Sequence, residues 1–337
     1  MDAVVTPRNR WAFAFGTVGR DMVYSMMAVF LIVFLTEVLD LDDVTMWWIN
    51  GILLAVRLLD AFDDVITGYI IDNTRTRWGQ YKPWIAVGAA LTAVLTILLF
   101  TDFGARDLYV GQIEAVFDRY APGVRVIHLL HEAPAFDVKA SAHLLAALAG
   151  TVARGHVILG VVDPGVGTQR AGIVARIDGR TFVGPDNGLF SVLWQRSTMK
   201  SAWRITAYPP GVSASFHGRD VFAPLASAVV TGEFPNETVE AIRAPDVLLA
   251  GADLAEIIYL DHYGNAFTGL RGANLPEDRA LVVGECVVPH APVFGDAPDG
   301  RAFWYVNSIG LVEIAVPRDS AARALGLRVG QAVAWSE

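Results

Sequence analysis

Residues 91–104 read LTAVLTILLFTDFG, and this stretch decides how the chain is organised. Its first ten residues are apolar or threonine and could continue a membrane helix that begins near Trp84. Its last residues are typical of a buried strand that runs into an acidic turn, as at the start of an α/β domain. One backbone segment cannot be both a membrane helix and a buried strand. Which of the two it forms therefore decides whether the chain is organised as a transporter or as an enzyme.

The composition divides the chain into two parts. The 337 residues carry a formal net charge of −9 and a single cysteine, Cys286, and their mean hydropathy is +0.41. Long apolar runs are confined to residues 11–100, and the remainder has the texture of a globular α/β chain. An acidic chain without a basic stripe argues against nucleic acid as a partner. One cysteine excludes an internal disulfide and gives no cluster of metal ligands.

Three segments near the N-terminus have membrane character, and they comprise residues 22–38, 46–71 and 84–101. A span needs about 20 mostly apolar residues, so the second is ample and the other two are somewhat short. Basic residues lie before the first segment and between the second and third, whereas the loop LDLDD at residues 39–43 has none. The positive-inside rule therefore places the N-terminus and the second loop in the cytoplasm.

The second segment carries charges that a membrane span normally excludes. Arg57, Asp60 and Asp64 share one face of a helix at this spacing. Carboxylates inside a span are costly and usually mark the path of an ion or a substrate. The alternative is an amphipathic helix that lies in a soluble core.

Two motifs in this region resemble the sugar–cation symporters of the melibiose-permease family. They are GTVGRD at residues 16–21 and RLLDAFDDVITGYIIDNTRTRWGQYKPW at residues 57–84. The resemblance implies a vestigial cation site at Asp21, Asp60 and Asp64. The family needs about twelve helices, built as two facing halves, and at most three are present here. We therefore expect residues 1–95 to be a truncated piece of a symporter that cannot transport alone.

Beyond Asp102 the chain alternates between helical and strand-like patterns, as in a layered α/β domain. Helices are predicted over residues 108–120 and 138–153, strands over 124–130 and 156–163, and a hairpin that turns at Asp178-Gly179 over 173–184. Beyond about residue 244 short strands with glycine-rich turns dominate, with one late helix near residues 319–326. The sequence thus predicts an α/β domain over 96–240 and a smaller β-barrel-like domain over 241–337, preceded by an α-helical membrane-type segment.

Four polar clusters interrupt the apolar scaffold of the α/β domain, and each follows a strand-like run. They are TDFGARD (101–107), VVDPGVGTQR (161–170), PDNG (185–188) and SFHGRD (215–220). Ligands of α/β domains bind at strand ends, so these clusters are candidates for one site. Each motif alone is a weak signal, because Asp-Pro-Gly is usually a turn and a lone histidine is usually structural.

Taken together and in this order, the clusters resemble the S-adenosylmethionine hydroxide adenosyltransferases, relatives of the chlorinating and fluorinating enzymes. DHYGN at residues 261–265 and NSIGLVEIAV at residues 307–316 extend the resemblance to the second domain. It implies that S-adenosylmethionine and water react to give adenosine and L-methionine, so that the α/β domain is catalytic. S-adenosylmethionine is then the substrate, and neither a cofactor nor a metal is implied.

The resemblance implies that Asp163, Arg170 and His217 hold the attacking water. The attack occurs at the saturated 5′ carbon of ribose and expels a neutral thioether, so no general acid is needed for departure. Catalysis must then come from aligning and activating the nucleophile. Asp163 or His217 could take the proton of the water, and Arg170 would stabilise hydroxide-like charge.

The resemblance also implies roles in substrate binding for five residues. Asp102 would accept hydrogen bonds from the ribose hydroxyls, and Phe136 would form a wall beside the nucleoside. Asn265 would read the edge of the adenine. Asp261 and Ser308 would hold the amino and carboxylate ends of the methionine.

Halogenation is the close competitor of hydrolysis. The halogenating relatives have Tyr and Thr where this chain has Asp163 and Val166, and Tyr where it has His217. They also carry an Arg where this chain has Ile309. A carboxylate at position 163 would repel a halide ion, so the sequence favours water as the nucleophile.

The seam between the two resemblances lies at residues 96–101, which both families would accept. We predict a strand there, because Asp102 must follow a strand end for the nucleoside site to exist. Residues 84–95 then provide about 12 apolar positions, or roughly 18 Å of helix, which is too short to span a bilayer. We therefore predict a two-span or partly disordered N-terminal piece joined to a cytoplasmic enzyme, which two spans within residues 22–71 would anchor to the membrane.

Two further functions stay open, in addition to halogenation. One is a membrane protein that binds a nucleoside without turnover, and the other is a fragment of a sugar–cation symporter that assembles with other chains. The adenosyltransferase resemblance also implies a homotrimer, with the substrate between the first domain of one subunit and the second domain of the next.

Overall fold

The computed structural model of the chain describes residues 96–273, 275 and 279–336, and five isolated positions before them. The predicted membrane segments and the predicted cation site of Asp21, Asp60 and Asp64 lie outside the described residues. Among the helices that are described, none combines the length and the apolar character needed to cross a bilayer. The fold below is that of the compact unit formed by residues 86–337.

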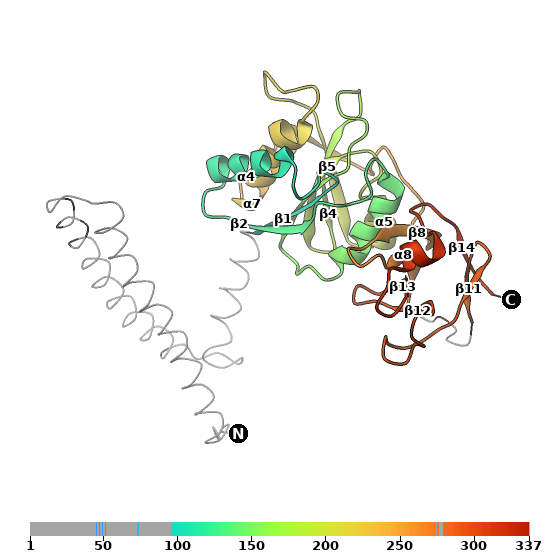
Figure 1. Cartoon of the computed structure of the whole chain (residues 1–337). Coiled ribbons are helices and arrows are strands. Elements are labelled where there is room, and N and C mark those ends of the chain that lie inside the picture. Colours follow the sequence, from blue (N-terminus) through green and yellow to red (C-terminus); the bar gives the residue numbers. More distant parts are fainter. Residues whose placement is uncertain are drawn as a thin grey trace. The chain divides into compact units, whose positions relative to one another are not determined.

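The decisive stretch TILLFT forms a strand, β1, over Thr96–Thr101, and all six of its residues are buried. This confirms the strand prediction at the seam. β1 lies inside a seven-stranded sheet of order β2-β1-β3-β5-β4-β6-β7 (Figure 1). The other strands are β2 Arg125–Leu130, β3 Val157–Val161, β4 Gly172–Ile177, β5 Arg180–Pro185, β6 Lys200–Ile205 and β7 Val239–Ile242.

The sheet is mixed rather than parallel throughout. β2, β1, β3 and β5 run parallel, whereas β4 pairs antiparallel with β5 and β6, and β6 pairs antiparallel with β7. The antiparallel part begins at the predicted hairpin, whose turn residues Asp178 and Gly179 have φ values of 49° and 79°. Two consecutive positive φ values are what a tight two-residue hairpin requires, so this prediction is confirmed.

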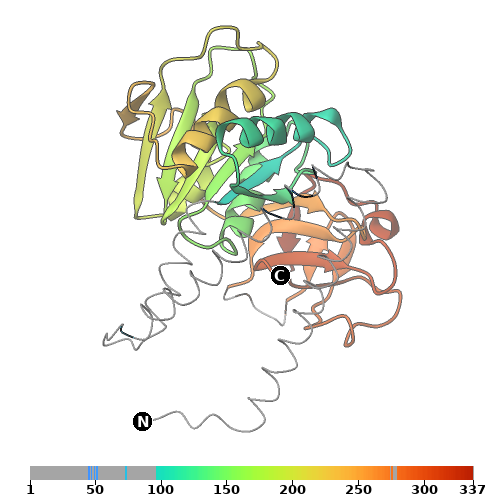
Figure 2. The ribbon, with the colours of Figure 1, turned by 90° about the vertical axis from the view of Figure 1, so that its left-hand side faces the viewer.

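Helices cover both faces of the sheet, and the alternation of side chains along β1 explains why. Ile97 and Leu99 belong to the core beneath two of the helices, whereas Leu98 and Phe100 belong to the core on the opposite face. Figure 2 shows the first pair of helices, α4 and α7, side by side on one face. The helices are α4 Leu108–Tyr120, α5 Val138–Ala149, α6 Ser191–Arg196, the π-helical turn η2 Gly218–Phe222, and α7 Ala223–Val230.

A smaller antiparallel β domain follows and packs on the α5 side of the sheet. Its strands form two sheets, of orders β12-β13-β9-β8 and β11-β10-β14. The predicted late helix is confirmed as α8, capped by Ser320 and ended by Gly326 in the left-handed conformation. The elements are β8 Leu254–Leu260, β9 Ala266–Arg271, β10 Leu281–Val283, β11 Cys286–Val288, β12 Phe303–Val306, β13 Leu311–Ala315, α8 Ala321–Leu325 and β14 Val333–Trp335.

His143 on α5 makes the stability of this unit sensitive to acid. It is 5% exposed, and its Nδ1 atom has no hydrogen-bond partner among the described residues. Burial, followed by the charge of Arg196, lowers the pKa of His143 from 6.5 to about 4. The neutral form is favoured in the fold, so the stability present above pH 6.5 is lost as the pH falls toward 4. The linked loss amounts to about 3 kcal/mol.

We expect the melting temperature of a His143→Leu variant to fall less between pH 7 and pH 4.5 than that of the parent chain. Differential scanning calorimetry at several pH values measures this difference. A His262→Leu variant, which changes an exposed histidine, is the control and should follow the parent curve. Parallel curves for the parent and the His143→Leu variant would contradict the assignment.

Candidate active site

The loop that follows β3 folds back on itself, so that Arg170 returns to the side of Asp163. Two successive turns achieve this, with the Val166 N–H donating to the Asp163 carbonyl (3.2 Å) and the Thr168 N–H donating to the Gly165 carbonyl (3.2 Å). Gly167 has a φ of +78°, and a Cβ atom there would lie 2.5 Å from the Ala214 carbonyl oxygen. Only glycine allows the loop to pack this closely against the segment that leads to His217.

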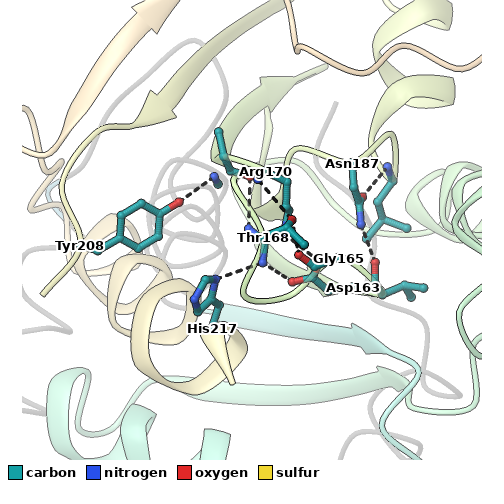
Figure 3. A network of polar contacts seen from close by, with 11 residues as sticks. Asp163, Gly165, Thr168, Arg170, Asn187, Tyr208 and His217 are labelled. Atoms are coloured by element: carbon teal, nitrogen blue, oxygen red, sulfur yellow. Dashed lines mark hydrogen bonds and ion pairs between the residues drawn. The ribbon is translucent and has the colours of Figure 1, made fainter. Parts of the chain in front are cut away.

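Arg170 joins the other two predicted catalytic residues through its guanidinium group (Figure 3). Its Nε donates to Oδ1 of Asp163 (2.8 Å), its Nη2 donates to Oδ2, and Nη2 also lies 3.2 Å from Nδ1 of His217. The side chains of Arg170 and Asp163 are 10% and 6% exposed, and the guanidinium lies 5.2 Å from the ring centre of Phe222. A buried, two-pronged ion pair of this kind fixes the position of both groups.

The contact with Arg170 also determines the tautomer of His217. A guanidinium can only donate, so Nδ1 of His217 accepts and the proton of the neutral ring lies on Nε2. Burial and the charge of Arg170 lower the pKa of His217, which keeps the ring neutral. In this arrangement His217 can donate a hydrogen bond from Nε2, whereas its basic nitrogen is occupied.

Asp163 and His217 share a small cavity with two of the residues predicted to bind the substrate. The cavity has a volume of about 110 Å³, and its lining includes Asp102 and Phe136. Oδ2 of Asp102 accepts a hydrogen bond from the Phe136 N–H (3.1 Å). Burial raises the pKa of Asp102, and the nearby charge of Asp163 adds to the increase. Arg170 lines an adjoining cavity of about 500 Å³, which it shares with His217.

The PDNG cluster supports the loop that carries Asp163 and Arg170. Asn187 donates from Nδ2 to the Val162 carbonyl (2.8 Å), directly before Asp163, and its Oδ1 accepts from the Leu189 N–H (3.2 Å). Asn187 thus ties the end of β3 to the turn after β5. Among the residues that the structure describes, no group of three His, Cys, Asp or Glu side chains is arranged to hold a metal ion.

The remaining predicted residues line a different cavity, in the β domain. Asp261, Asn265 and Ser308 lie on the wall of a space of about 810 Å³. The Asp261 carboxylate accepts from the Asn265 backbone N–H (2.8 Å) and from Asn265 Nδ2 (3.1 Å). The structure therefore brings the predicted residues together in two groups, and none of the three cavities described above is lined by members of both groups.

The sequence prediction missed a buried carboxylate in this second cavity. Glu313 is 2% exposed, and its oxygens accept hydrogen bonds from the Tyr305 hydroxyl (2.6 Å) and from Asn307 Nδ2 (3.0 Å). Oδ1 of Asn307 in turn accepts hydrogen bonds from the N–H groups of Ile309 and Leu311, which flank Gly310 in the turn that follows Ser308. Burial raises the pKa of Glu313. A lone acidic residue in the apolar strand LVEIA was the signal that could have revealed it.

Comparisons with known proteins agree with both resemblances. Residues 97–239 match the model of the S-adenosylmethionine hydroxide adenosyltransferase N-terminal domain, and residues 255–334 match that of the C-terminal domain. Residues 12–113 match the model of an MFS/sugar transport protein, which overlaps the first match over the seam. The lactose permease of Lactobacillus helveticus is 34% identical over 96 residues, and this chain covers 15% of its length.

Two relatives and two solved structures cover the enzyme region. (R)-S-adenosyl-L-methionine hydrolases of Thermus thermophilus and Salinispora arenicola are 38% and 36% identical, over 70% and 68% of this chain and 98% and 93% of their own lengths. A crystal structure of an uncharacterised protein from Thermotoga maritima has a TM-score of 0.65 at 28% identity, over 72% of this chain and all of its own. A conserved hypothetical protein from Thermus thermophilus has a TM-score of 0.59 at 36% identity, over 72% of this chain and 99% of its own. The chain therefore belongs to the S-adenosylmethionine hydroxide adenosyltransferase family.

Proposed function

We propose that this chain hydrolyses S-adenosylmethionine to adenosine and L-methionine. The observation that carries the proposal is the junction of Asp163, Arg170 and His217 beside the cavity that Asp102 lines. The relatives named (R)-S-adenosyl-L-methionine hydrolases support the same reaction. Their name specifies the R form of the sulfonium, and we extend this preference to the present chain.

In the proposed reaction the oxygen of a water molecule forms a bond to C5′ of the ribose while the bond between C5′ and sulfur breaks. The electron pair of that bond goes to the sulfur, which leaves as the neutral thioether of methionine. Asp163 takes the proton of the water, because the basic nitrogen of His217 is occupied by Arg170. The Nε2–H of His217 and the charge of Arg170 stabilise the hydroxide-like oxygen during the attack.

The roles in substrate binding follow the two groups of residues. Asp102 accepts hydrogen bonds from the ribose hydroxyls, and Phe136 walls the nucleoside in the smaller cavity. Asn265, Asp261 and Ser308 hold the adenine and the methionine ends from the larger cavity. This assignment is the reason to propose a second copy of the chain, since the two groups line separate cavities within one subunit.

We propose a homotrimer in which the small cavity of one subunit faces the large cavity of the next. Exposed aromatic side chains lie in the lining of both cavities, namely Phe136 in the first and Tyr263 and Phe294 in the second. Aromatic side chains are enriched at interfaces between subunits, so they support this arrangement. We also propose that the β domain closes into a barrel-like shape and that the domains divide at residues 95 and 240. The enzyme would lie in the cytoplasm, anchored to the membrane through residues 22–71.

Product analysis with two competing nucleophiles tests the proposed reaction. The purified chain is incubated with each sulfonium epimer of S-adenosylmethionine, with and without chloride, and the products are separated by chromatography. We expect adenosine and methionine both with and without chloride, and only from the R form of S-adenosylmethionine. A chlorinated nucleoside would favour the halogenase alternative, and bound substrate without product would favour a nucleoside-binding protein. A chain that lacks residues 1–94, assayed in parallel, tests whether the enzyme works without its upstream piece.

A further inference from the structure

A chain of hydrogen bonds outside the catalytic junction connects the protein surface to the strand that precedes Asp102. It begins at Glu114 on α4, whose Oε1 lies 2.9 Å from Nε2 of His128 on β2. Nδ1 of His128 lies 2.7 Å from Nε2 of His131. Nδ1 of His131 then lies 2.8 Å from the hydroxyl of Thr101, the last residue of β1. The chain runs from a half-exposed carboxylate to a buried hydroxyl.

A bulge in β2 brings the two histidines together. Residues three apart in a regular strand point to opposite faces of the sheet. Along β1, Leu99 pairs with His128 and Phe100 pairs with Leu130, so Leu129 is an extra residue in β2. A bulge of this kind re-aims the side chains that follow it. The irregularity therefore explains how His128 and His131 come to share one side.

The donor capacities of the four groups give the chain a single direction while both rings are neutral. The Glu114 carboxylate can only accept, so Nε2 of His128 carries the proton and Nδ1 of His128 accepts. Nε2 of His131 must then donate to His128, which leaves Nδ1 of His131 as an acceptor. The Thr101 hydroxyl therefore donates to His131. Its lone pairs remain free to accept the Phe103 N–H, at 3.4 Å.

His131 holds the loop that carries Asp102 in two ways. Its backbone carbonyl accepts from the Gly104 N–H (2.8 Å), and its ring orients the hydroxyl that accepts from Phe103. The Asp102 N–H itself donates to the carbonyl of Val161 on the neighbouring strand (3.4 Å). All three backbone N–H groups of residues 102–104 are thus bonded, and Asp102 and Phe103 both line the small cavity.

We propose that the chain Glu114–His128–His131–Thr101 positions the carboxylate of Asp102 for the ribose of the substrate. His131 acts as the positioning residue, and Glu114 and His128 fix its tautomer from the surface. The inference rests on the proposed function, because it takes Asp102 as the ribose acceptor. The inference predicts that reversing the donors and acceptors along this chain of hydrogen bonds weakens binding of the nucleoside and leaves the chemical step largely intact.

Substitutions at Glu114 reverse this direction without touching the core. In Glu114→Lys the ammonium can only donate, so it forces Nε2 of His128 to accept and turns every donor in the chain around. Glu114→Gln keeps an acceptor oxygen for Nε2 of His128, so this variant should bind the substrate as the parent does. The control is Asp118→Lys, which makes the same change of charge at an exposed position of the same helix.

We expect Glu114→Lys to raise KM for S-adenosylmethionine by about fivefold, the effect of one or two misdirected hydrogen bonds, with kcat within about twofold of the parent. Both Glu114→Gln and Asp118→Lys should keep the KM of the parent. Thr101→Val removes the hydroxyl at the inner end and should raise KM in the same way. The inference is overturned when Glu114→Lys and Asp118→Lys have the same KM.

A second measurement separates failure of this inference from failure of the proposed function. If the parent chain releases no adenosine from S-adenosylmethionine, the proposed hydrolysis is wrong, and the dissociation constant of adenosine from calorimetry then replaces KM. The inference stands when Glu114→Lys binds adenosine about fivefold more weakly than Asp118→Lys. It falls when the two bind equally, or when the parent binds no adenosine.

Discussion

Replacing Asp163 with asparagine is expected to lower kcat for adenosine release by about 10³-fold, within the range that general-base catalysis contributes. Asparagine has nearly the same shape, but it cannot take a proton from water. It also offers Arg170 one acceptor oxygen in place of two, so the guanidinium loses part of the contact that orients it beside His217. KM should change much less, because in the proposed mechanism Asp163 contacts the nucleophile rather than the nucleoside.

The matched control is Asp246→Asn, which removes the carboxylate of a second Asp–Arg pair, with Arg204, and neither residue of that pair lines the cavities of Asp163, Arg170 and His217. Steady-state rates and melting temperatures of the two variants are measured together. Asp246→Asn should keep the kcat of the parent. If Asp163→Asn retained more than about a tenth of the parent kcat, a general base at this position would be ruled out.

Gly184→Ala is expected to destabilise the enzyme unit by about 3 kcal/mol or to prevent its folding, as overpacking of a core does. Gly184 is the residue of β5 directly after Val183, the last residue that pairs with β3. A Cβ atom at Gly184 would lie 2.1 Å from the backbone oxygen of Gly160 and 3.0 Å from Cζ of Phe190. The clash with backbone can be relieved only by moving a central strand. That movement would also displace the PDNG turn, which follows directly and holds the end of β3, just before Asp163, through Asn187.

The matched control for this substitution is Gly111→Ala. A Cβ atom at Gly111 would meet nothing within 4 Å, and the residue lies within helix α4. Alanine has the higher helix propensity, so this variant should gain up to about 1 kcal/mol. Urea unfolding, followed by circular dichroism, measures both. A Gly184→Ala chain as stable as the parent would show that β3 and β5 can separate without cost.

The family resemblance named Asp163, Arg170 and His217, and the structure brings these three side chains into contact. Two turns within residues 163–170 return Arg170 to Asp163, and β1 follows from an apolar run with a threonine at each end. The roles of these residues in the reaction stay predictions. The lone acid Glu313 is visible in the apolar run LVEIA, but its hydrogen bonds are not, since they depend on which side chains the neighbouring strand places opposite it.

The pairing of His128 with His131 was hidden for a different reason. Their spacing of three residues is wrong for one face of a strand, and only the extra residue Leu129 corrects it. A bulge depends on the register between two strands, which the local sequence does not encode. The same limit applies to the division of the predicted binding residues between two cavities, because a motif indicates what a residue contacts and not which copy of the chain supplies the contact.

The place of β1 within the sheet has a mechanical consequence for the junction with the upstream piece. β1 is hydrogen-bonded along both edges, to β2 and to β3, and both ladders run parallel to it. A pull transmitted through the residues before Thr96 would therefore load two ladders in shear at the same time, rather than peel an outer strand. Tension on the N-terminal segment would therefore be borne by the two ladders of β1, one of which joins it to β3, the strand that leads to Asp163.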